Sequence, residues 1–379
     1  MRGRRVIATV LFVGLGVGSL LALRLGYVDR LKERVQGRAV RLAAGDFPAG
    51  VTAPVDDVAS IPTRPVLVGV VPRGTVAPLV WASLKDDKPG LLRTAYALDV
   101  KVVTYESEDG LRRALVKGAE NGGVDLAALA VSTLGMSAQP LRDAAPRTVM
   151  LLGRSRGQDV LGARAGALAP AQLQGKRLAT EPRSPSHYFA LWVLSRAGLS
   201  MRDVTWVPLE SAFQAGQALR DGKADVAAGF EGDVHPAVRE LGGSLVSTTA
   251  DAPHLVATVL VARGDFAARY PDAVRRLLRG LLDANAQVIK APEEAARALM
   301  AVAPGLGDPT EAILAAPPAT TRENLAFFGL TGEAPVTYAE LYQSAVALSV
   351  KLTGTGSAPS AEETADLGAL KYVSATQRP

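Results

Sequence analysis

Four polar residues beside a predicted helix start are the best candidates for binding chemistry: Arg183, Ser184, Ser186 and His187. Ser184 is followed by proline and an apolar run, a pattern typical of a capped helix, which we expect over residues 185–197. The first turn of a helix leaves backbone N–H groups without partners and carries the positive end of the helix dipole. It therefore suits a small oxyanion, although most such starts only cap their own helix.

The composition excludes several kinds of function. The chain has 379 residues, enough for two domains, and it lacks cysteine, which excludes disulfides and thiolate metal sites. The net charge of +5 is unevenly distributed, because residues 1–41 hold nine Lys/Arg and two Asp/Glu, whereas the remainder holds 33 basic and 35 acidic residues. The charge of the globular part therefore does not indicate a basic face that could bind phosphates, and we expect no nucleic-acid partner.

The N-terminus carries a hydrophobic segment. Three arginines within the first five residues precede 18 uncharged, mostly apolar residues at 6–23. This pattern is typical of a signal peptide or a single membrane anchor, and we assign residues 1–25 to it. No clear cleavage site follows, which favours an uncleaved anchor, whereas the six basic residues after the segment favour a cytoplasmic C-terminal side. Residues 26–63 are predicted to form a basic helix and an extended linker.

From residue 64 onward, short apolar runs alternate with helical patterns. Strands are expected at 66–71, 100–105, 124–131, 147–152, 160–163, 176–180, 204–209, 224–229, 244–247 and 255–262. This alternation predicts an α/β fold with parallel, doubly wound sheets in two similar halves. Residues 265–352 are predicted to be mainly helical, and residues 353–379 to be a linker and a tail.

Several segments, taken together, resemble the solute-binding proteins of ABC importers for nitrate, taurine and aliphatic sulfonates. They are Val-Gly-Val-Val-Pro at 68–72, the segment 123–133, Glu-Pro-Arg-Ser-Pro-Ser-His-Tyr at 181–188, and the segments 197–205, 222–228 and 324–328. The resemblance covers residues 64–352. It implies a fold similar to periplasmic binding proteins, with two lobes joined by a hinge. Residues 64–152 and 255–352 would form lobe one, and residues 153–254 lobe two.

Ligands of open α/β sheets bind beyond the carboxyl ends of the strands, and polar residues of this chain gather in those loops. The candidate ligand-binding residues are Arg73, Gly74, Thr75, Ser132, Thr133, Arg183, Ser184, Ser186, His187, Phe230 and Glu231. The alternative is that some of them only end a strand. Two arginines near the predicted cleft favour an anion. Glu231 would repel one, unless it pairs with an arginine or the solute also carries a positive group.

The resemblance implies a binding protein rather than an enzyme, with no cofactor and no metal. The expected ligand is a small anion or zwitterion such as a sulfonate, taurine or nitrate, delivered to an ABC permease and ATPase. The protein would lie in the periplasm or on the outer face of the cytoplasmic membrane, attached through the N-terminal helix if this is not cleaved. One alternative is a membrane-tethered sensor or scaffold with the same fold. Another is an enzyme similar to synthases of the thiamine pyrimidine precursor, against which the presence of only three histidines argues.

Overall fold

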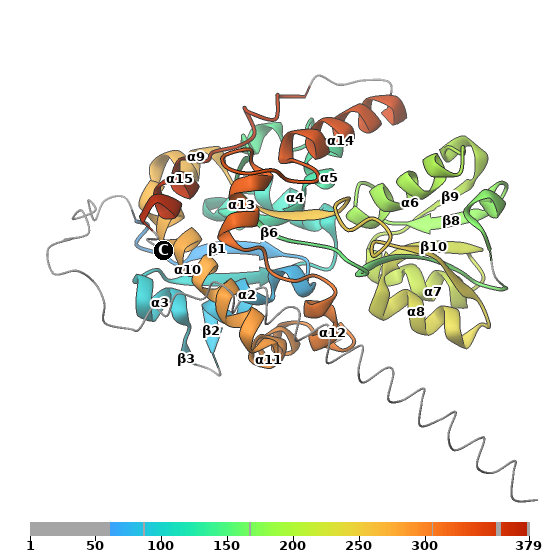
Figure 1. The fold of residues 1–379 in the computed structure, drawn as a ribbon, viewed down its shortest axis with the longest axis horizontal. Helices are drawn as coiled ribbons and strands as arrows, with labels where there is room; N and C mark the ends of the chain where they lie inside the picture. Colours follow the sequence, from blue (N-terminus) through green and yellow to red (C-terminus); the bar gives the residue numbers. More distant parts are fainter. Residues whose placement is uncertain (1–60, 86–87, 167, 305, 354–357, 377–379) are drawn as a thin grey trace, which may run out of the picture. The chain divides into compact units, whose positions relative to one another are not determined.

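The computed structural model of the protein describes residues 61–376, apart from 86–87, 167, 305 and 354–357. Within this part of the chain, two sheets of five strands each are flanked by helices, and a two-stranded hairpin lies beside them (Figure 1). None of the helices in the described part is long and apolar enough to span a membrane. The N-terminal segment and the linker predicted up to residue 60 lie outside the described residues.

The first sheet has the strand order β4-β1-β5-β12-β6. Strands β1, β4 and β5 run parallel, while β12 runs antiparallel to β5 and to β6. The bounds are Val66–Val70 for β1, Val100–Thr104 for β4, Leu126–Ala130 for β5, Arg147–Arg154 for β6 and Ala257–Ala262 for β12.

Helices cover both faces of this sheet, so alternate residues of a strand enter different cores. Leu126 and Ala128 of β5 pack in the core that contains α2 (Ala77–Ser83) and α10 (Pro271–Lys290). Ala127 and Leu129 pack in a second core, formed with α4 (Glu108–Lys117), α5 (Val131–Met136), α13 (Thr321–Phe327) and α14 (Tyr338–Thr353). Burial on both faces accounts for the continuous apolar run of this strand.

The second sheet has the strand order β11-β7-β10-β8-β9. Its strands are β7 (Asp159–Ala163), β8 (Arg177–Thr180), β9 (Thr205–Pro208), β10 (Val226–Phe230) and β11 (Ser244–Thr248). Helix α6 (Pro185–Arg196) packs on one face through residues such as Phe189 and Leu194. Helices α7 (Ala215–Arg220) and α8 (Glu231–Glu240) pack on the other face.

The prediction of wholly parallel sheets is wrong, because each sheet is mixed. Strand β7 runs antiparallel to β10 and β11, as β12 does to its neighbours in the first sheet. Neighbouring parallel strands need a long crossover between them, usually a helix. The chain instead passes directly from β6 to β7 and from β11 to β12, so these two crossings do not impose a parallel direction.

The two crossings are hydrogen-bonded to each other. Ser155 Oγ lies 2.6 Å from Thr249 Oγ1, and the N–H of Gly157 donates to the same Thr249 oxygen at 2.9 Å. The N–H of Ser155 also donates to the carbonyl of Val256 at 2.9 Å. The two segments that connect the sheets therefore lie next to each other and are held together by hydrogen bonds.

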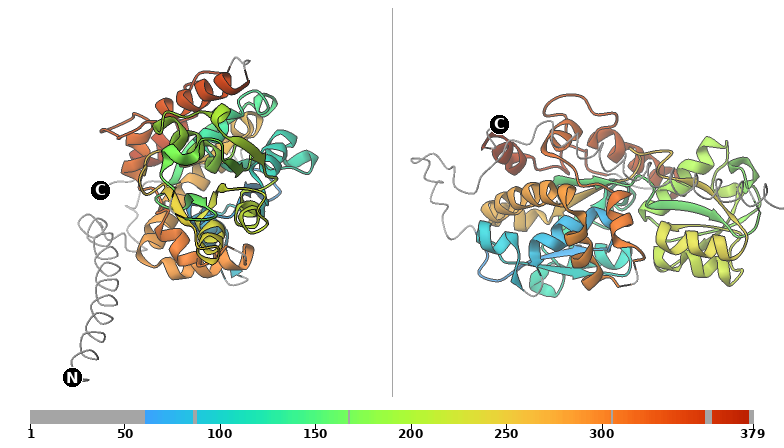
Figure 2. Two further views of the ribbon diagram at one scale, coloured as in Figure 1. Left: turned by 90° about the vertical axis from the view of Figure 1, so that its right-hand side faces the viewer. Right: turned by 60° about the horizontal axis from the view of Figure 1, so that its bottom comes forward.

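Helices α15 and α8 lie where the sequence predicts a C-terminal tail and a loop. The C-terminal segment is not only a linker and a tail, because α15 (Gly368–Thr376) packs beside α10 and buries Leu370 and Val373 (Figures 1 and 2). Phe230 and Glu231, two of the residues expected in loops beyond the strand ends, do not lie in a loop, because Phe230 ends β10 and Glu231 begins α8. Helix α8 contains Pro236, and because proline disfavours the interior of a helix, the sequence does not predict a helix here.

The remaining elements lie around the two sheets. They are β2 (Leu84–Lys85), β3 (Lys88–Pro89), α3 (Leu91–Tyr96), α9 (Gly264–Arg269), α11 (Pro292–Val302), α12 (Pro309–Leu314), and 3-10 helices at Gly74–Val76, Ala119–Asn121, Arg142–Ala144, Pro170–Leu173, Met201–Asp203 and Ala212–Gln214.

Candidate functional site

Helix α6 begins where the sequence predicts it. Ser184 caps the helix, because its Oγ accepts the N–H of His187 at 3.0 Å and donates to the carbonyl of Glu181 at 2.8 Å. Strand β8 ends at Thr180, so this cap lies at the carboxyl end of the strand. The predicted cap is confirmed, and it engages the fully buried hydroxyl of Ser184 within the chain.

The second serine of the helix start is held by a carboxylate. Ser186 Oγ donates to Oδ1 of Asp159 at 2.8 Å, and both side chains are fully buried. The other carboxylate oxygen, Oδ2, has no hydrogen-bond partner among the described residues. A buried acceptor without a partner is a place where a hydrogen-bond donor would be stabilised.

Arg73, Thr133 and Phe230 come together around Glu108. The guanidinium of Arg73 donates to Glu108 Oε1 at 2.8 Å and lies over the ring of Phe230, 4.9 Å from its centroid. Thr133 Oγ1 donates to Glu108 Oε2 at 3.4 Å. Burial raises the pKa of Glu108, although Arg73 and Arg112 oppose the rise. The positive charge of Arg73 is thus already paired inside the protein.

Glu181 connects residues of the two sheets. Its carboxylate accepts the N–H of Asp109, in the first turn of α4, at 3.2 Å and the N–H of Ala212 at 3.1 Å. Burial, with the nearby charge of Glu108, raises the pKa of Glu181 to about 8. The carboxyl of Glu181 therefore occupies the kind of helix start that could otherwise accept an anion.

Three more predicted residues are enclosed by the first sheet and its helices. Thr75 Oγ1 donates to Thr258 Oγ1 at 3.3 Å. At Gly74, an added Cβ would lie 1.9 Å from the carbonyl oxygen of Ala312, so glycine lets α12 approach closely. Ser132 is buried, and its Oγ has no partner among the described residues.

Glu231 lies apart from the helix start of α6. Its Oε1 is 2.6 Å from Nδ1 of His235, so a histidine rather than an arginine is its partner. With Arg73 and Phe230 it lines a cavity of about 160 Å³. Among the residues that the structure describes, no three His, Cys, Asp or Glu side chains are grouped to hold a metal ion.

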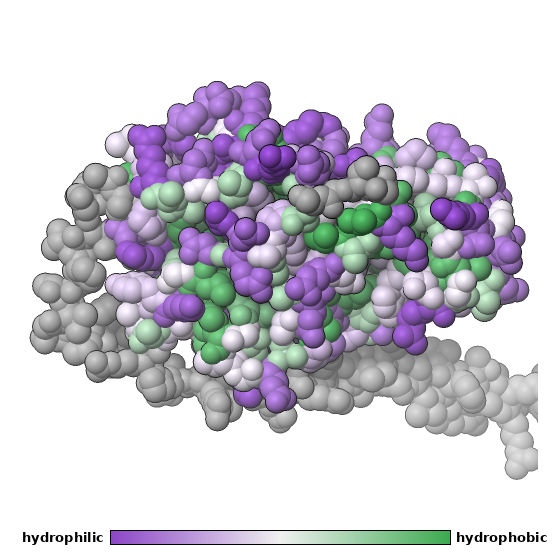
Figure 3. Space-filling view, turned by 90° about the horizontal axis from the view of Figure 1, so that it is seen from above, coloured by the Kyte–Doolittle hydropathy of each residue, from purple (hydrophilic) through white to green (hydrophobic). Residues whose placement is uncertain are grey.

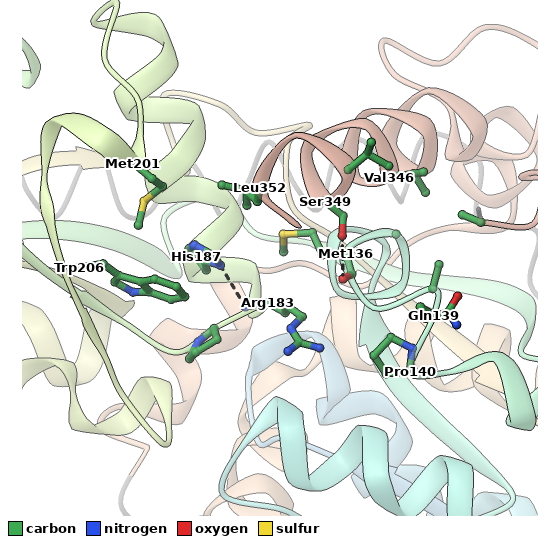
Figure 4. Close-up of a pocket in the computed structure, with 15 residues that line it drawn as sticks. Met136, Gln139, Pro140, Arg183, His187, Met201, Trp206, Val346, Ser349 and Leu352 are labelled. Atoms are coloured by element: carbon green, nitrogen blue, oxygen red, sulfur yellow. Dashed lines mark hydrogen bonds between the residues drawn. The ribbon is translucent and has the colours of Figure 1, made fainter. Parts of the chain in front are cut away.

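Arg183 and His187 line a different and larger cavity, of about 750 Å³. One wall carries Met201 and Trp206 with His187, and the other carries Met136 of α5 and Leu352 of α14 (Figure 4). The complete lining is Gly135, Met136, Ala138, Gln139, Pro140, Pro182, Arg183, His187, Met201, Trp206, Val346, Ser349, Val350, Leu352 and Ala358.

His187 presents one hydrogen-bond donor without a partner. Its Nδ1 accepts the N–H of Arg183 at 3.0 Å, and its ring stacks on Trp206 with centroids 5.0 Å apart. Burial and the charge of Arg183 lower the pKa of His187 to about 4, so the ring is neutral at pH 7. Since Nδ1 is an acceptor, the proton resides on Nε2, which has no partner among the described residues.

The predicted residues therefore divide among the two cavities and a buried polar cluster. This cluster consists of Ser132, Thr133, Ser184 and Ser186 with Glu108, Asp159, Thr180 and Glu181. Sequence patterns did not indicate Glu108, Asp159, Trp206 or Leu352. The available signal for Glu108 was a capped helix start, because Ser107 precedes it and accepts the N–H of Gly110. The other three carry no such local pattern.

Comparison with known proteins gives the fold class. Residues 158–295 match the model of the NMT1/THI5-like family. The structure resembles the periplasmic aliphatic sulphonate binding protein SsuA from Escherichia coli, with 18% identity, a TM-score of 0.60, and coverage of 79% of this chain and 91% of that chain. A search of curated proteins found no match.

Two other solved structures share the fold. The alkanesulfonate-binding protein SsuA from Xanthomonas axonopodis pv. citri, bound to MOPS, has 21% identity and a TM-score of 0.55, with 68% of this chain and 87% of that chain covered. The desulfurization enzyme DSZB has 13% identity and a TM-score of 0.56, with 83% and 100% covered. This chain therefore has the periplasmic-binding-protein fold. Both binding proteins and an enzyme use it, so the fold alone does not define an activity.

Proposed function

We propose that this chain is an extracytoplasmic solute-binding protein, which captures a small anion or zwitterion and delivers it to an ABC permease and ATPase. The observation that carries this proposal is the buried polar cluster between the two sheets. Ser132 and Thr133 follow β5, Glu181 follows β8, and these strand ends are where α/β folds bind ligands.

The cluster contains hydrogen-bonding groups that the described residues leave unused. Ser132 Oγ, Asp159 Oδ2 and Thr180 Oγ1 are buried without a partner among the described residues, and so is Nε2 of His187 beside the larger cavity. Such groups cost free energy unless something pairs with them, and a bound solute would do so. The group includes donors and acceptors, which is consistent with either an anion or a zwitterion.

We further propose that the two sheets belong to lobes that open and close around the crossings at 155–158 and 249–256. The lobes would comprise residues 64–152 with 255–352, and residues 153–254. Opening would break the contacts that join the lobes, among them Glu181 with Asp109, the Arg183 carbonyl with Arg112, the Ser211 hydroxyl with the carbonyl of Glu106, Tyr188 with Ser344, and Arg73 with the ring of Phe230. Opening would expose the buried cluster to a solute, and closure would enclose it.

The possible nucleophiles and bases at the start of α6 are already engaged in hydrogen bonds, which favours a binding function over catalysis. Ser184 is engaged in the cap and Ser186 is bonded to Asp159. His187 Nδ1 already accepts a backbone N–H, so it cannot take a proton from a serine. We place the protein in the periplasm or on the outer face of the cytoplasmic membrane, with residues 1–25 as its signal peptide or anchor.

The proposal is tested by titration calorimetry of the full chain with ethanesulfonate, taurine and nitrate. We expect saturable binding of at least one of them and about tenfold weaker binding after Ser132→Ala, since one hydrogen bond to the ligand is lost. Ser137→Ala is the matched control, because Ser137 is also buried with an unpartnered Oγ but lies at the C-terminal end of α5 rather than beside the end of β5. Equal losses in both variants would contradict the proposal, as would the failure of these solutes and of larger organic anions alike to bind.

A further inference from the structure

The larger cavity is too big for the smallest of the expected solutes. Its volume of about 750 Å³ lies within the range of roughly 300–1,000 Å³ that encloses drug-sized ligands. Nitrate and taurine have only a few heavy atoms and would leave most of this space unfilled. The cavity therefore indicates a ligand with a substantial body.

The walls of the cavity indicate that this body is apolar. Large hydrophobic side chains that remain exposed in the described part of the chain are Leu84, Trp206, Met300, Val350, Leu352 and Tyr372. Three of these six, Trp206, Val350 and Leu352, line this one cavity. The face of the molecule that carries α14 also shows hydrophobic surface amid hydrophilic residues (Figure 3). Exposed hydrophobic residues that gather in one place mark a binding surface.

The polar groups at the cavity are a cation and a donor. The guanidinium of Arg183 is exposed, and no aspartate or glutamate is among the described residues that line the cavity. His187 is 3% exposed and neutral, and its Nε2–H has no partner. In Figure 4 the imidazole of His187 lies at the cavity, and the dashed line marks the bond between its Nδ1 and the N–H of Arg183. Both groups stabilise an acceptor with negative charge.

We infer that this cavity binds an amphipathic organic anion, whose acidic head group lies at Arg183 and the Nε2–H of His187 and whose apolar body lies between Trp206 and Leu352. The inference rests on the proposed function and specifies its substrate class, a sulfonate or carboxylate with a long or bulky apolar group. Such a ligand uses both features of the cavity, the single cation and the hydrophobic walls.

The experiment compares head group and tail separately. The full chain is titrated calorimetrically with octane-1-sulfonate, ethanesulfonate, 1-octanol, taurine and nitrate. We expect octane-1-sulfonate to bind at least about tenfold more tightly than ethanesulfonate, because each buried methylene contributes favourably. It should also bind at least about tenfold more tightly than 1-octanol, which lacks the anionic head group.

Variants locate the binding. Arg183→Gln should weaken octane-1-sulfonate binding about tenfold and leave the affinity for 1-octanol unchanged. The matched control is Arg239→Gln, which removes an exposed arginine from α8 and should leave both affinities unchanged. Leu352→Ser should weaken both ligands, since it removes part of the apolar wall.

Each contrary result has a separate meaning. If taurine, nitrate or ethanesulfonate binds as tightly as octane-1-sulfonate, the inferred substrate class is wrong and the proposed function stands. Equal affinity for 1-octanol, or equal losses in the Arg183 and Arg239 variants, would also overturn the inferred site. If none of the anions binds, both the inference and the proposed function fail.

Discussion

Replacing Arg183 by glycine should stabilise the protein while it weakens ligand binding. Arg183 has φ +60°, in the left-handed region that costs a residue with a side chain about 1–2 kcal/mol. Glycine avoids this cost but loses about 0.5–1 kcal/mol more conformational entropy on folding. The difference predicts that Arg183→Gly raises the free energy of unfolding by about 0.5–1 kcal/mol.

The contacts of Arg183 support this direction. Its N–H donates to His187 Nδ1 at 3.0 Å, and its carbonyl accepts a bond from Arg112 at 3.5 Å. Both are backbone groups, so glycine keeps them. Burial and the nearby charge of Arg112 lower the pKa of the Arg183 side chain, so its charge is not stabilised where it lies.

The assay has two parts, urea denaturation for stability and calorimetry with octane-1-sulfonate for binding. We expect higher stability together with about tenfold lower affinity, since the cation is removed. Ala97→Gly is the control, because Ala97 also has a positive φ, at the end of α3, and lines neither cavity. It should be stabilised by a similar amount without any change in affinity.

Two results would refute this reasoning. If Arg183→Gly lowers the free energy of unfolding, the side chain stabilises the fold by more than the backbone strain costs. If stability rises but octane-1-sulfonate binds unchanged, the strained position of Arg183 has no connection with ligand binding.

Three further predictions concern stability. Because the pKa of Glu181 is about 8 when folded and ordinarily near 4.5, the unfolded chain releases this proton first, so the free energy of unfolding falls as pH rises between those values. Glu181→Gln should reduce that fall, by up to about 1.4 kcal/mol per pH unit, in urea denaturation at a series of pH values; an unchanged pH profile would contradict the assigned pKa. Asn324→Ala should lower the free energy of unfolding by about 2–4 kcal/mol in the same assay, because the Asn324 amide bonds both the N–H and the carbonyl of Leu151. A loss below about 1 kcal/mol would show that water replaces the amide. Leu370→Ala should lower stability by about 2–5 kcal/mol, and an unaffected melting temperature would mean that α15 is not part of the core.

Much of the fold could be predicted because its signals are local. Apolar runs marked the strands, and the Ser184 cap marked the start of α6 within the sequence itself. The direction of β7 and β12 could not be predicted, since it depends on partners far away in the chain. Helix α8 was missed because Gly232 and Pro236 both disfavour a helix, and packing against the second sheet outweighs that preference.

The site was less predictable because its side chains pair over long distances in sequence. Arg73 and Glu108 are separated by 35 positions, and nothing near either residue indicates the other. Trp206 and Leu352 likewise meet only across the cavity. Sequence patterns could thus propose which residues are polar and near strand ends, but not which of them are already neutralised by a partner.

Whether an arginine is already neutralised by a carboxylate determines whether it can bind an anion. Two arginines near the cleft are the reason to expect an anion, but Arg73 is paired with Glu108. A second carboxyl group, that of Glu181, accepts a backbone N–H in the first turn of α4. With Asp159 beside them, the buried cluster supplies three carboxyl groups, which favour a solute that brings a hydrogen-bond donor or a positive group, such as a zwitterion, over a simple inorganic anion. Arg183 alone of the two predicted arginines has no carboxylate at its cavity, and it lies where the walls become apolar. We therefore expect the charged group of the solute to bind at the start of α6, and the hydrophobic walls to select solutes by their apolar part. The affinity of octane-1-sulfonate relative to 1-octanol measures the first contribution, and its affinity relative to ethanesulfonate measures the second.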